Sequence, residues 1–244
     1  MPTVLLTGGA RRLGGALARG FAARGYNVGI TYHTSEPAAA ATVAACAEAG
    51  VRAAMRRCDV ADTASLEHAV ASLFDELGTP DVIVSNAGIF PERTTVDKLD
   101  VDAVRHAIDV NTLPLVTLAR LYHDRLTRSS VEHGRLISIS SLGALEIWRD
   151  RLAYNVSKSA LLTAVMSLAR SAAPRMSVNT VAPGAILMPQ EPTSNDAAML
   201  QAERIPMARY GTSDDVMDAV WFFATCSPYI TGQVLAVDGG SHLV

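Results

Sequence analysis

Short apolar runs recur along the chain and alternate with longer segments in which apolar residues return every three or four positions. Within each short run the apolar residues are continuous, which is typical of strands buried on both faces of a parallel sheet. These runs predict about seven strands, at residues 4–6, 28–31, 51–55, 82–84, 136–139, 178–181 and 234–237.

The longer segments predict helices between the strands. Several begin just after Asp, Ser or Thr, which are good helix N-caps. The predicted helices span 16–23, 37–49, 65–77, 101–127, 152–172 and 213–225. Strand and helix therefore alternate. This order favours an α/β fold of the Rossmann type, a doubly wound parallel sheet with helices on each side, in a single domain over residues 1–244.

Composition and charge narrow the possible partners. The net charge of −3, without a Lys- or Arg-rich block, gives no general attraction for nucleic acid. The three cysteines and six histidines lack the spacing of a disulfide framework or of a metal site, so we expect no metal. A strand is predicted within a few residues of the N-terminus, which leaves no room for a leader, and no apolar stretch reaches membrane-spanning length. We therefore expect a soluble, cytoplasmic protein that acts on a small molecule.

A glycine-rich loop joins the first predicted strand to the first helix. Gly8, Gly9 and Gly14 let the backbone turn tightly and approach a pyrophosphate, which the helix N-terminus would stabilise. Arg12 stands where a dinucleotide loop of the usual three-glycine spacing has Gly. The alternative is an ordinary glycine turn with solvated arginines. The expected cofactor contacts from this loop are Gly8, Arg11, Arg12 and Leu13.

The residues that follow the second strand indicate which dinucleotide is bound. Tyr32, His33, Thr34 and Ser35 include no acidic side chain that would bond a ribose 2′-hydroxyl. With Arg11 across the groove, the hydroxyls and the imidazole suit a 2′-phosphate instead, so NADPH is favoured over NADH. On its own, His33 fits a solvated loop about as well.

Two further strand ends are expected to hold the adenosine half of the cofactor. They carry Asp59 and Val60 after the third strand, and Asn86, Ala87 and Gly88 after the fourth. Asp59 could accept from the adenine amino group, and the small residues would admit the cofactor closely. Taken singly, each feature is more often a helix cap or a turn.

Tyr154 and Lys158 carry the candidate chemistry. Their spacing puts them on one face of a helix, and Ser141 lies thirteen residues before Tyr154, at the end of the fifth strand. A nearby ammonium stabilises a phenolate, so Tyr154 could act as an acid near neutral pH while Ser141 holds the accepting atom. Lys158 could also anchor the ribose hydroxyls. Tyr and Lys one turn apart are nevertheless common on amphipathic helices.

Together these motifs resemble the short-chain dehydrogenase/reductase family over the whole chain. The residues that carry the resemblance are Thr7-Gly8…Gly14, Asp59, Asn86-Ala87-Gly88, Asn111, Ser141, Tyr154…Lys158 and Pro183-Gly184. The resemblance implies one Rossmann-type domain, NAD(P) binding and a catalytic set of Asn111, Ser141, Tyr154 and Lys158, in which Asn111 holds a water against Lys158. It also implies cofactor contacts from Pro183, Gly184 and Ile186, and a homotetramer built on helices 101–127 and 152–172.

Within that family, Arg12 and the Tyr32–Ser35 segment resemble the pteridine reductases and dihydromonapterin reductases. In that group the arginine reaches toward the pterin and the cofactor phosphates, and an aromatic residue at the place of Phe90 stacks on the pterin ring. The expected substrate contacts are Arg12, Phe90, Ser141 and Tyr154. The predicted activity is NADPH-dependent reduction of dihydrobiopterin, dihydromonapterin or dihydrofolate, beneath a lid at about residues 184–210.

Ser141 keeps alternatives open. Well-studied pteridine reductases have Asp at this place, and a serine hydroxyl also suits a ketone oxygen. The second reading is therefore an NADPH-dependent carbonyl reductase that acts on a ketone or a 3-oxoacyl thioester. A third, a dinucleotide-sensing protein without catalysis, is disfavoured because all four catalytic positions hold competent residues. The lid segment fits a plain surface loop nearly as well.

Overall fold

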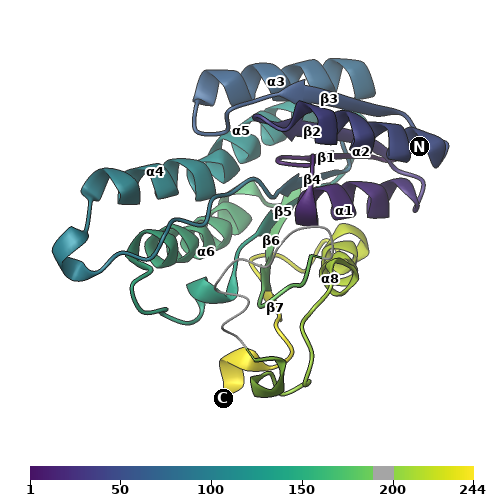
Figure 1. Ribbon diagram of the computed structural model, residues 1–244. Coiled ribbons are helices and arrows are strands. Elements are labelled where there is room, and N and C mark those ends of the chain that lie inside the picture. The colour runs from purple at the N-terminus through teal and green to yellow at the C-terminus, as the bar shows by residue number, and fades with distance from the viewer. Residues whose placement is uncertain (189–200) are drawn as a thin grey trace.

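A parallel sheet runs through the middle of the molecule, with helices on both of its faces (Figure 1). The computed structural model describes residues 1–188 and 201–244. Within them the sheet has seven strands in the order β3-β2-β1-β4-β5-β6-β7, which confirms the predicted fold class. The strands are β1 Thr3–Leu6, β2 Asn27–Tyr32, β3 Ala53–Arg57, β4 Val82–Ser85, β5 Gly134–Ile139, β6 Met176–Pro183 and β7 Val234–Val237.

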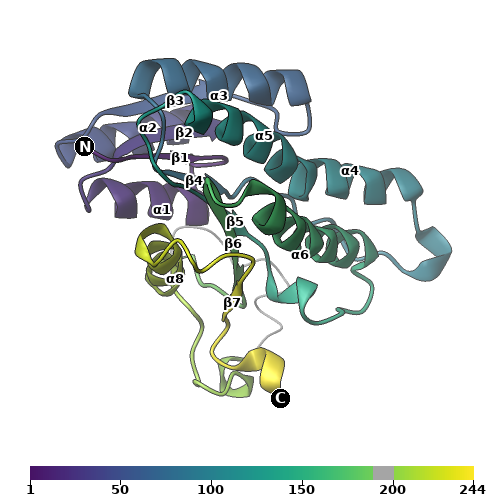
Figure 2. The same ribbon diagram turned by 180° about the vertical axis from the view of Figure 1, so that it is seen from behind.

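The helices form two layers that enclose the sheet. One hydrophobic cluster joins the sheet to α1, α2 and α8, and a second joins it to α3, α5 and α6. Seen from behind, α4 lies beside α6 on the second face (Figure 2). The helices are α1 Arg12–Ala22, α2 Glu36–Glu48, α3 Thr63–Leu77, α4 Val101–Asn111, α5 Leu113–Thr127, α6 Leu152–Ala172 and α8 Ser213–Thr225. No helix in these described residues is both long and apolar enough to cross a membrane.

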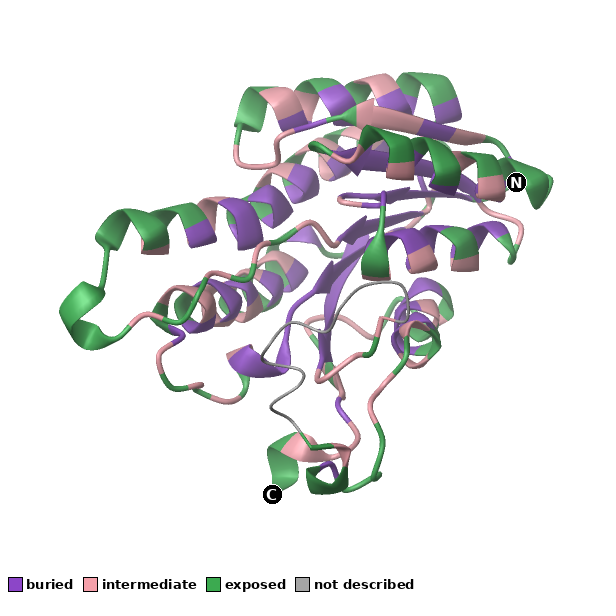
Figure 3. Ribbon diagram, in the orientation of Figure 1, coloured by how far each residue is buried: buried purple, intermediate pink, exposed green. Residues whose placement is uncertain are grey.

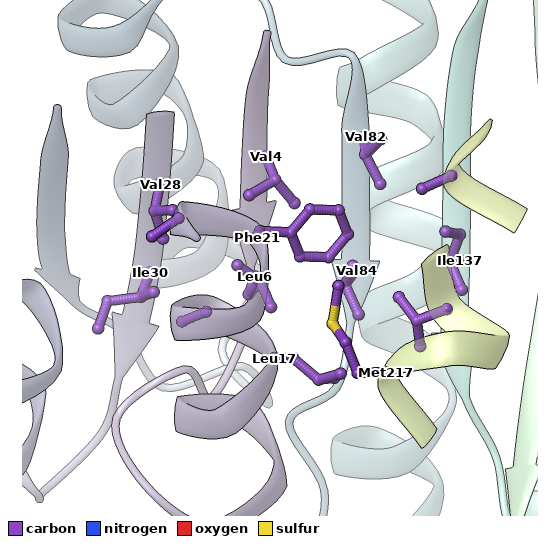
Figure 4. Close-up of a cluster of buried hydrophobic side chains, with 14 of the residues drawn as sticks. Val4, Leu6, Leu17, Phe21, Val28, Ile30, Val82, Val84, Ile137 and Met217 are labelled. Atoms are coloured by element: carbon purple, nitrogen blue, oxygen red, sulfur yellow. The ribbon is translucent and has the colours of Figure 1, made fainter. Parts of the chain in front are cut away.

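Strand β1 shows why its apolar run is continuous. Val4 and Leu6 point into the first cluster, where they pack with Leu17 and Phe21 of α1 (Figure 4), and Leu5 belongs to the second cluster. Successive strand residues face opposite sides of a sheet, so a strand covered on both sides needs apolar residues throughout. The inner strands are buried, whereas the edge strands β3 and β7 are partly exposed (Figure 3).

The structure corrects three predicted boundaries. The segment predicted as one helix over 101–127 is two helices that break at Thr112, because Pro114 in the first turn of α5 cannot continue a helix from α4. The third strand is Ala53–Arg57, not 51–55, and Val51 is buried just before it. Helix α1 begins at Arg12 instead of residue 16, so the glycine-rich loop runs directly into it.

The order of the strands fixes where a ligand can bind. Chain order reverses between β1 and β4, and in open α/β sheets the crevice at this switch point is the usual ligand site. Hydrogen bonds join the two strand ends there, because Thr7 Oγ1 accepts from the backbone N–H groups of Asn86 at 3.0 Å and Ala87 at 3.1 Å. The fold thus brings the glycine-rich loop against the Asn86–Gly88 segment.

Candidate active site

A groove of about 600 Å³ opens at the carboxyl ends of the strands, on both sides of the switch point. It collects most of the residues predicted as cofactor or substrate contacts. Those that line it are Gly8, Arg11, Arg12, Leu13, Tyr32, His33, Thr34, Ser35, Asp59, Val60, Asn86, Ala87, Gly88, Phe90, Tyr154 and Lys158. One continuous surface therefore runs from the predicted 2′-phosphate site to the predicted catalytic pair.

The glycine loop forms the floor of this groove, and two of its glycines have no room for a side chain. Gly8 has a φ of +64°, and a Cβ on it would lie 2.9 Å from Ala87 Cα. A Cβ on Gly14 would lie 2.1 Å from the carbonyl oxygen of Gly8. The Asn86 side chain fastens the loop by donating to the carbonyls of Thr7 at 3.0 Å and Gly8 at 3.1 Å. The backbone is thus held open for close approach of a phosphate.

Arg12 is strained at the point where the loop enters α1. Its φ is +51°, in the left-handed region that favours glycine, and this conformation costs a non-glycine residue about 1–2 kcal/mol. The residue lines the groove. The usual loop has glycine at this position, and glycine would adopt this backbone conformation without strain. Arginine here therefore costs backbone energy, which suggests that its side chain has a function.

At the other end of the groove, the residues after β2 meet the residues after β3. His33 Nε2 lies 3.9 Å from Asp59 Oδ2, and the Arg57 guanidinium donates to the His33 carbonyl at 3.3 Å. The His33 side chain is 59% exposed, so it is open to a ligand that enters from solvent. Thr34 and Ser35, which both carry hydroxyl groups, line the same end of the groove.

Tyr154 lies half-buried at the end of the groove where catalysis is predicted. Burial raises the pKa of its phenol, whereas the hydrogen bond with Ser141 and the charge of Arg151 lower it, and the net direction is upward. The phenol is therefore protonated at neutral pH in this state. Ser141 Oγ also accepts from the Gly143 backbone N–H at 3.1 Å, which fixes the hydroxyl at the N-cap of a short 3-10 turn, Leu142–Ala144.

Lys158 and Asn111 lie together behind Gly88. A Cβ on Gly88 would be 2.9 Å from Asn111 Oδ1 and 3.6 Å from Lys158 Nζ. Lys158 Nζ donates to the Ile139 carbonyl at 3.0 Å, and burial lowers the pKa of its ammonium to about 8. The Asn111 side chain is held in place by a hydrogen bond, in which its Oδ1 accepts from the backbone N–H of Ile89 at 2.8 Å. The predicted residues Ser141 and Asn111 are thus adjacent to the groove and not on its lining.

Sequence reasoning missed the aromatic and cationic surroundings of Tyr154. Trp148 stacks on its ring at 5.9 Å between centroids, and Phe90 meets it edge-on at 4.5 Å. The guanidinium carbon of Arg151 lies 4.2 Å from the centroid of Phe90. Arg151 could have been suspected, because with Tyr154 and Lys158 it has the i, i+3, i+7 spacing of one helix face.

The groove also has lining residues that were not predicted, and one of them bears on the cofactor. Ser140 Oγ is buried and has no hydrogen-bond partner among the described residues. A buried hydroxyl without a partner is costly, so a polar ligand in the groove would satisfy it. Together with the glycine floor, this observation fits a nucleotide cofactor. The other unpredicted lining residues include Ala10, Thr31, Cys58, Ile89, His106, Val110 and Ile139.

Three predicted cofactor residues lie outside the lining of this groove. Pro183 ends β6, Gly184 donates its backbone N–H to the Val237 carbonyl at 3.0 Å, and Ile186 forms an isolated bridge with Gly211. They stand where the predicted lid begins. The middle of that lid, residues 189–200, lies outside the described residues.

A family model described as "Enoyl-(Acyl carrier protein) reductase" matches residues 8–242. The chain belongs to the short-chain dehydrogenase/reductase family. It is 34% identical to 3beta-hydroxysteroid dehydrogenase 1 of Eggerthella lenta over 99% of this chain and 94% of that protein. It is 30% identical to a 3-oxoacyl-[acyl-carrier-protein] reductase of Synechocystis, over 97% and 95% of the two chains.

Among solved structures, the fold is similar to FolM alternative dihydrofolate reductase 1 from Brucella canis, complexed with NADP. The TM-score is 0.89 at 29% sequence identity, and the match covers 100% of this chain and 95% of that one. Membership of the family makes this chain an oxidoreductase that uses a nicotinamide dinucleotide. The groove and the residues around Tyr154 are the candidate site for this oxidation or reduction.

Proposed function

We propose that this chain is an NADPH-dependent reductase of a pteridine-type substrate such as dihydrobiopterin, dihydromonapterin or dihydrofolate. The observation that carries the proposal is Arg12, which is held at positive φ and lines the same groove as Phe90 and Tyr154. A cation and an aromatic ring suit a flat, polar heterocycle better than an aliphatic ketone. The similarity to the alternative dihydrofolate reductase of Brucella canis supports the same substrate class.

The residues around Tyr154 suit reduction. The bound dinucleotide would supply a hydride to the substrate. Tyr154, which burial keeps protonated, would donate the proton from its phenol oxygen, and Ser141 would orient the accepting atom by hydrogen bond. Lys158 would hold the ribose hydroxyls, and its ammonium would stabilise the phenolate that remains. Asn111 would keep a water in reach of Lys158, so that the proton is replaced from solvent.

The cofactor preference gives a prediction. We expect Arg11→Ala to weaken NADPH binding about tenfold and to change NADH binding less than about twofold, because only NADPH carries the 2′-phosphate that a guanidinium would pair with. The measurement is the dissociation constant of each cofactor by fluorescence titration. Arg128→Ala is the matched control, since Arg128 caps the far end of α5 and is exposed. Equal affinity of the unmodified protein for both cofactors would contradict the assignment.

The substrate class is tested by a turnover screen. Purified protein with NADPH is offered dihydrobiopterin, dihydromonapterin and dihydrofolate in parallel with simple ketones and a 3-oxoacyl thioester. We expect NADPH oxidation with at least one dihydropteridine, at a kcat/KM at least about tenfold above that for any ketone. NADPH binding without oxidation by any dihydropteridine would remove the proposal.

A second function has its own support. Ser141 provides a hydroxyl where a carboxylic acid would better relay a proton to a ring nitrogen, and a hydroxyl suits the oxygen of a ketone. The 3-oxoacyl-[acyl-carrier-protein] reductase of Synechocystis is similar to this chain over nearly its whole length. We therefore propose a 3-oxoacyl thioester or ketone reductase as the alternative, and the same screen separates the two, because turnover confined to ketones would favour it.

A further inference from the structure

Two loops meet beside Tyr154 and are joined by hydrogen bonds. One follows β4 and carries Phe90, Pro91 and Thr94, and the other precedes α6 and carries Asp150 and Arg151. The Thr94 backbone N–H donates to the Asp150 carbonyl at 2.9 Å, and the Arg151 guanidinium donates to the Pro91 carbonyl. We call this pair of loops, residues 89–95 and 145–151, the clasp.

Arg151 is the centre of the clasp. It is only 7% exposed although it carries a full charge, and its guanidinium carbon lies 4.2 Å from the Phe90 ring centroid. A guanidinium on an aromatic face, with a carbonyl as acceptor, is a favourable place for a partly desolvated cation. Phe90 itself is 42% exposed, so Arg151 covers one side of a ring whose other parts face the groove. The contact fixes the plane of Phe90.

The clasp surrounds Tyr154 with aromatic rings. Phe90 meets the Tyr154 ring edge-on at an interplanar angle of 89°, and Trp148 stacks on it at 16°. Phe90 and Trp148 also meet edge-on, with centroids 6.3 Å apart. The Trp148 carbonyl accepts from the Asn155 side chain at 2.8 Å, so this loop is tied to the first turn of α6. The orientation of Tyr154 therefore depends on both loops.

Backbone strain is located in the same place. Asp150 has a φ of +60°, which costs about 1–2 kcal/mol for a residue with a side chain, and it is the residue whose carbonyl bonds Thr94. Local strain persists where surrounding contacts outweigh it. Here those contacts are the bonds and rings of the clasp, which hold the chain in this geometry as it enters α6.

We propose that Arg151 is a positioning residue that holds Phe90 against the substrate ring and Tyr154 in line for proton donation. It acts through these two side chains and not by touching the reacting atoms. The inference rests on the proposed function in taking Tyr154 as the proton donor and a flat ring as the substrate. It adds a specificity determinant, because a fixed Phe90 edge and a Trp148 wall admit a flat ring more readily than a branched aliphatic group.

Because Arg151 is charged, its loss should change the pH dependence of activity, which the loss of a purely structural contact would not do. Its positive charge lowers the pKa of Tyr154, against the larger effect of burial. Reduction needs protonated Tyr154, so activity falls as the pH rises through that pKa, above the step near pH 8 at which Lys158 loses its proton. Loss of the Arg151 charge moves this upper alkaline limb to higher pH. The other charged groups of the surrounding elements are Lys158 on α6, Glu92 and Arg93 in the first loop, and Glu146, Arg149 and Asp150 in the second.

The test compares Arg151→Ala, Arg151→Lys and the control Arg149→Ala, in which an exposed arginine of the same loop is removed. We expect Arg151→Ala to raise KM for the dihydropteridine about tenfold and to shift the alkaline limb upward. Arg151→Lys keeps the charge and loses the planar stack, so it should raise KM with the limb unmoved. Arg149→Ala should behave as the unmodified protein. An Arg151→Ala protein with the KM and pH profile of Arg149→Ala overturns the proposal.

A second readout needs no substrate and so separates this inference from the proposed function. The chain has two tryptophans, Trp148 and Trp221, so in a Trp221→Phe background the fluorescence reports Trp148 alone. We expect iodide to quench Trp148 more strongly after Arg151→Ala or Phe90→Leu than after Arg149→Ala, because the clasp opens. Equal quenching in all three overturns the inference even if the protein proves to reduce ketones. If Arg151→Ala does not fold, Arg151→Lys and Phe90→Leu carry the same comparison.

Discussion

Tyr154→Phe should lower kcat/KM for NADPH-dependent reduction about 10³-fold and leave the NADPH dissociation constant within about twofold of its original value. The change removes one oxygen, the atom that would donate the proton, and leaves a ring of the same shape between Phe90 and Trp148. The groove floor is built by the glycine loop and Asn86, which the substitution does not touch. Stopped-flow turnover and a cofactor titration measure the two quantities.

The matched control for this variant is Tyr229→Phe. Tyr229 is 97% exposed, so loss of its hydroxyl should leave turnover unchanged. The comparison also decides against a dinucleotide-sensing protein, since such a protein would show no turnover to lose. Retained activity in Tyr154→Phe would mean that the proton comes from another group, and the assignment of the catalytic end of the groove would be wrong.

Lys158→Met should slow turnover strongly and raise the free energy of unfolding at pH 7. Burial lowers the pKa of Lys158 to about 8, and at about 1.4 kcal/mol for each pKa unit the buried charge costs on the order of 3 kcal/mol. Loss of the bond to the Ile139 carbonyl offsets roughly 1–2 kcal/mol of the gain. The expected net gain is on the order of 1 kcal/mol, with a fall in kcat of at least about 10²-fold.

The pH dependence follows from the sign of the shift. Below pH 8 the lysine is protonated in both the folded and the unfolded chain, so the full cost is present. As the pH rises from about 8 to about 10.4, the folded state releases its proton first and the cost fades. The stability advantage of Lys158→Met should therefore be largest near pH 7 and shrink above pH 8. Chemical denaturation of both proteins from pH 7 to 9 measures it.

Lys98→Met is the control, because Lys98 is the other of the two lysines in the chain and is exposed. Because the chain has only two lysines, the pKa of Lys158 can be measured directly by NMR. Labelling lysine with ¹⁵N gives one side-chain signal for Lys98 and one for Lys158. The Lys158 signal should titrate near pH 8. A titration at the ordinary pKa of an exposed lysine, or a variant less stable than the original at pH 7, would contradict the account of a desolvated ammonium.

Much of the fold could be predicted because the residues that the tertiary structure buries also form recognisable apolar patterns in the sequence. Val4, Leu5 and Leu6 are apolar in succession because helices cover both faces of β1, and that continuity is visible in the sequence. The errors fell where a local signal was weak. The turn at Thr112 was hidden in a segment of continuous helical period, and the start of α1 was hidden by its glycines.

The sequence could link the residues of the candidate catalytic end only along the helix. Tyr154 and Lys158 share one face of α6, and their spacing shows it. Phe90 and Arg151 lie sixty-one positions apart and meet because the sheet order brings β4 beside β5, so no local pattern links them. The same holds for Trp148, whose stacking on Tyr154 depends on how the loop before α6 folds back. Contacts between loops carry no periodicity, and that is why the clasp was missed.

The central claim is that a dihydropteridine receives its hydride in this groove, and transfer of deuterium tests it most directly. The protein is incubated with NADPH that carries deuterium at both C4 positions and with dihydrobiopterin, and the product is examined by mass spectrometry. We expect a tetrahydropteridine that contains one deuterium, formed by the unmodified protein and by Tyr229→Phe, and about 10³-fold more slowly by Tyr154→Phe. A product without deuterium, or deuterium found only in the alcohol from a ketone offered alongside, would contradict it.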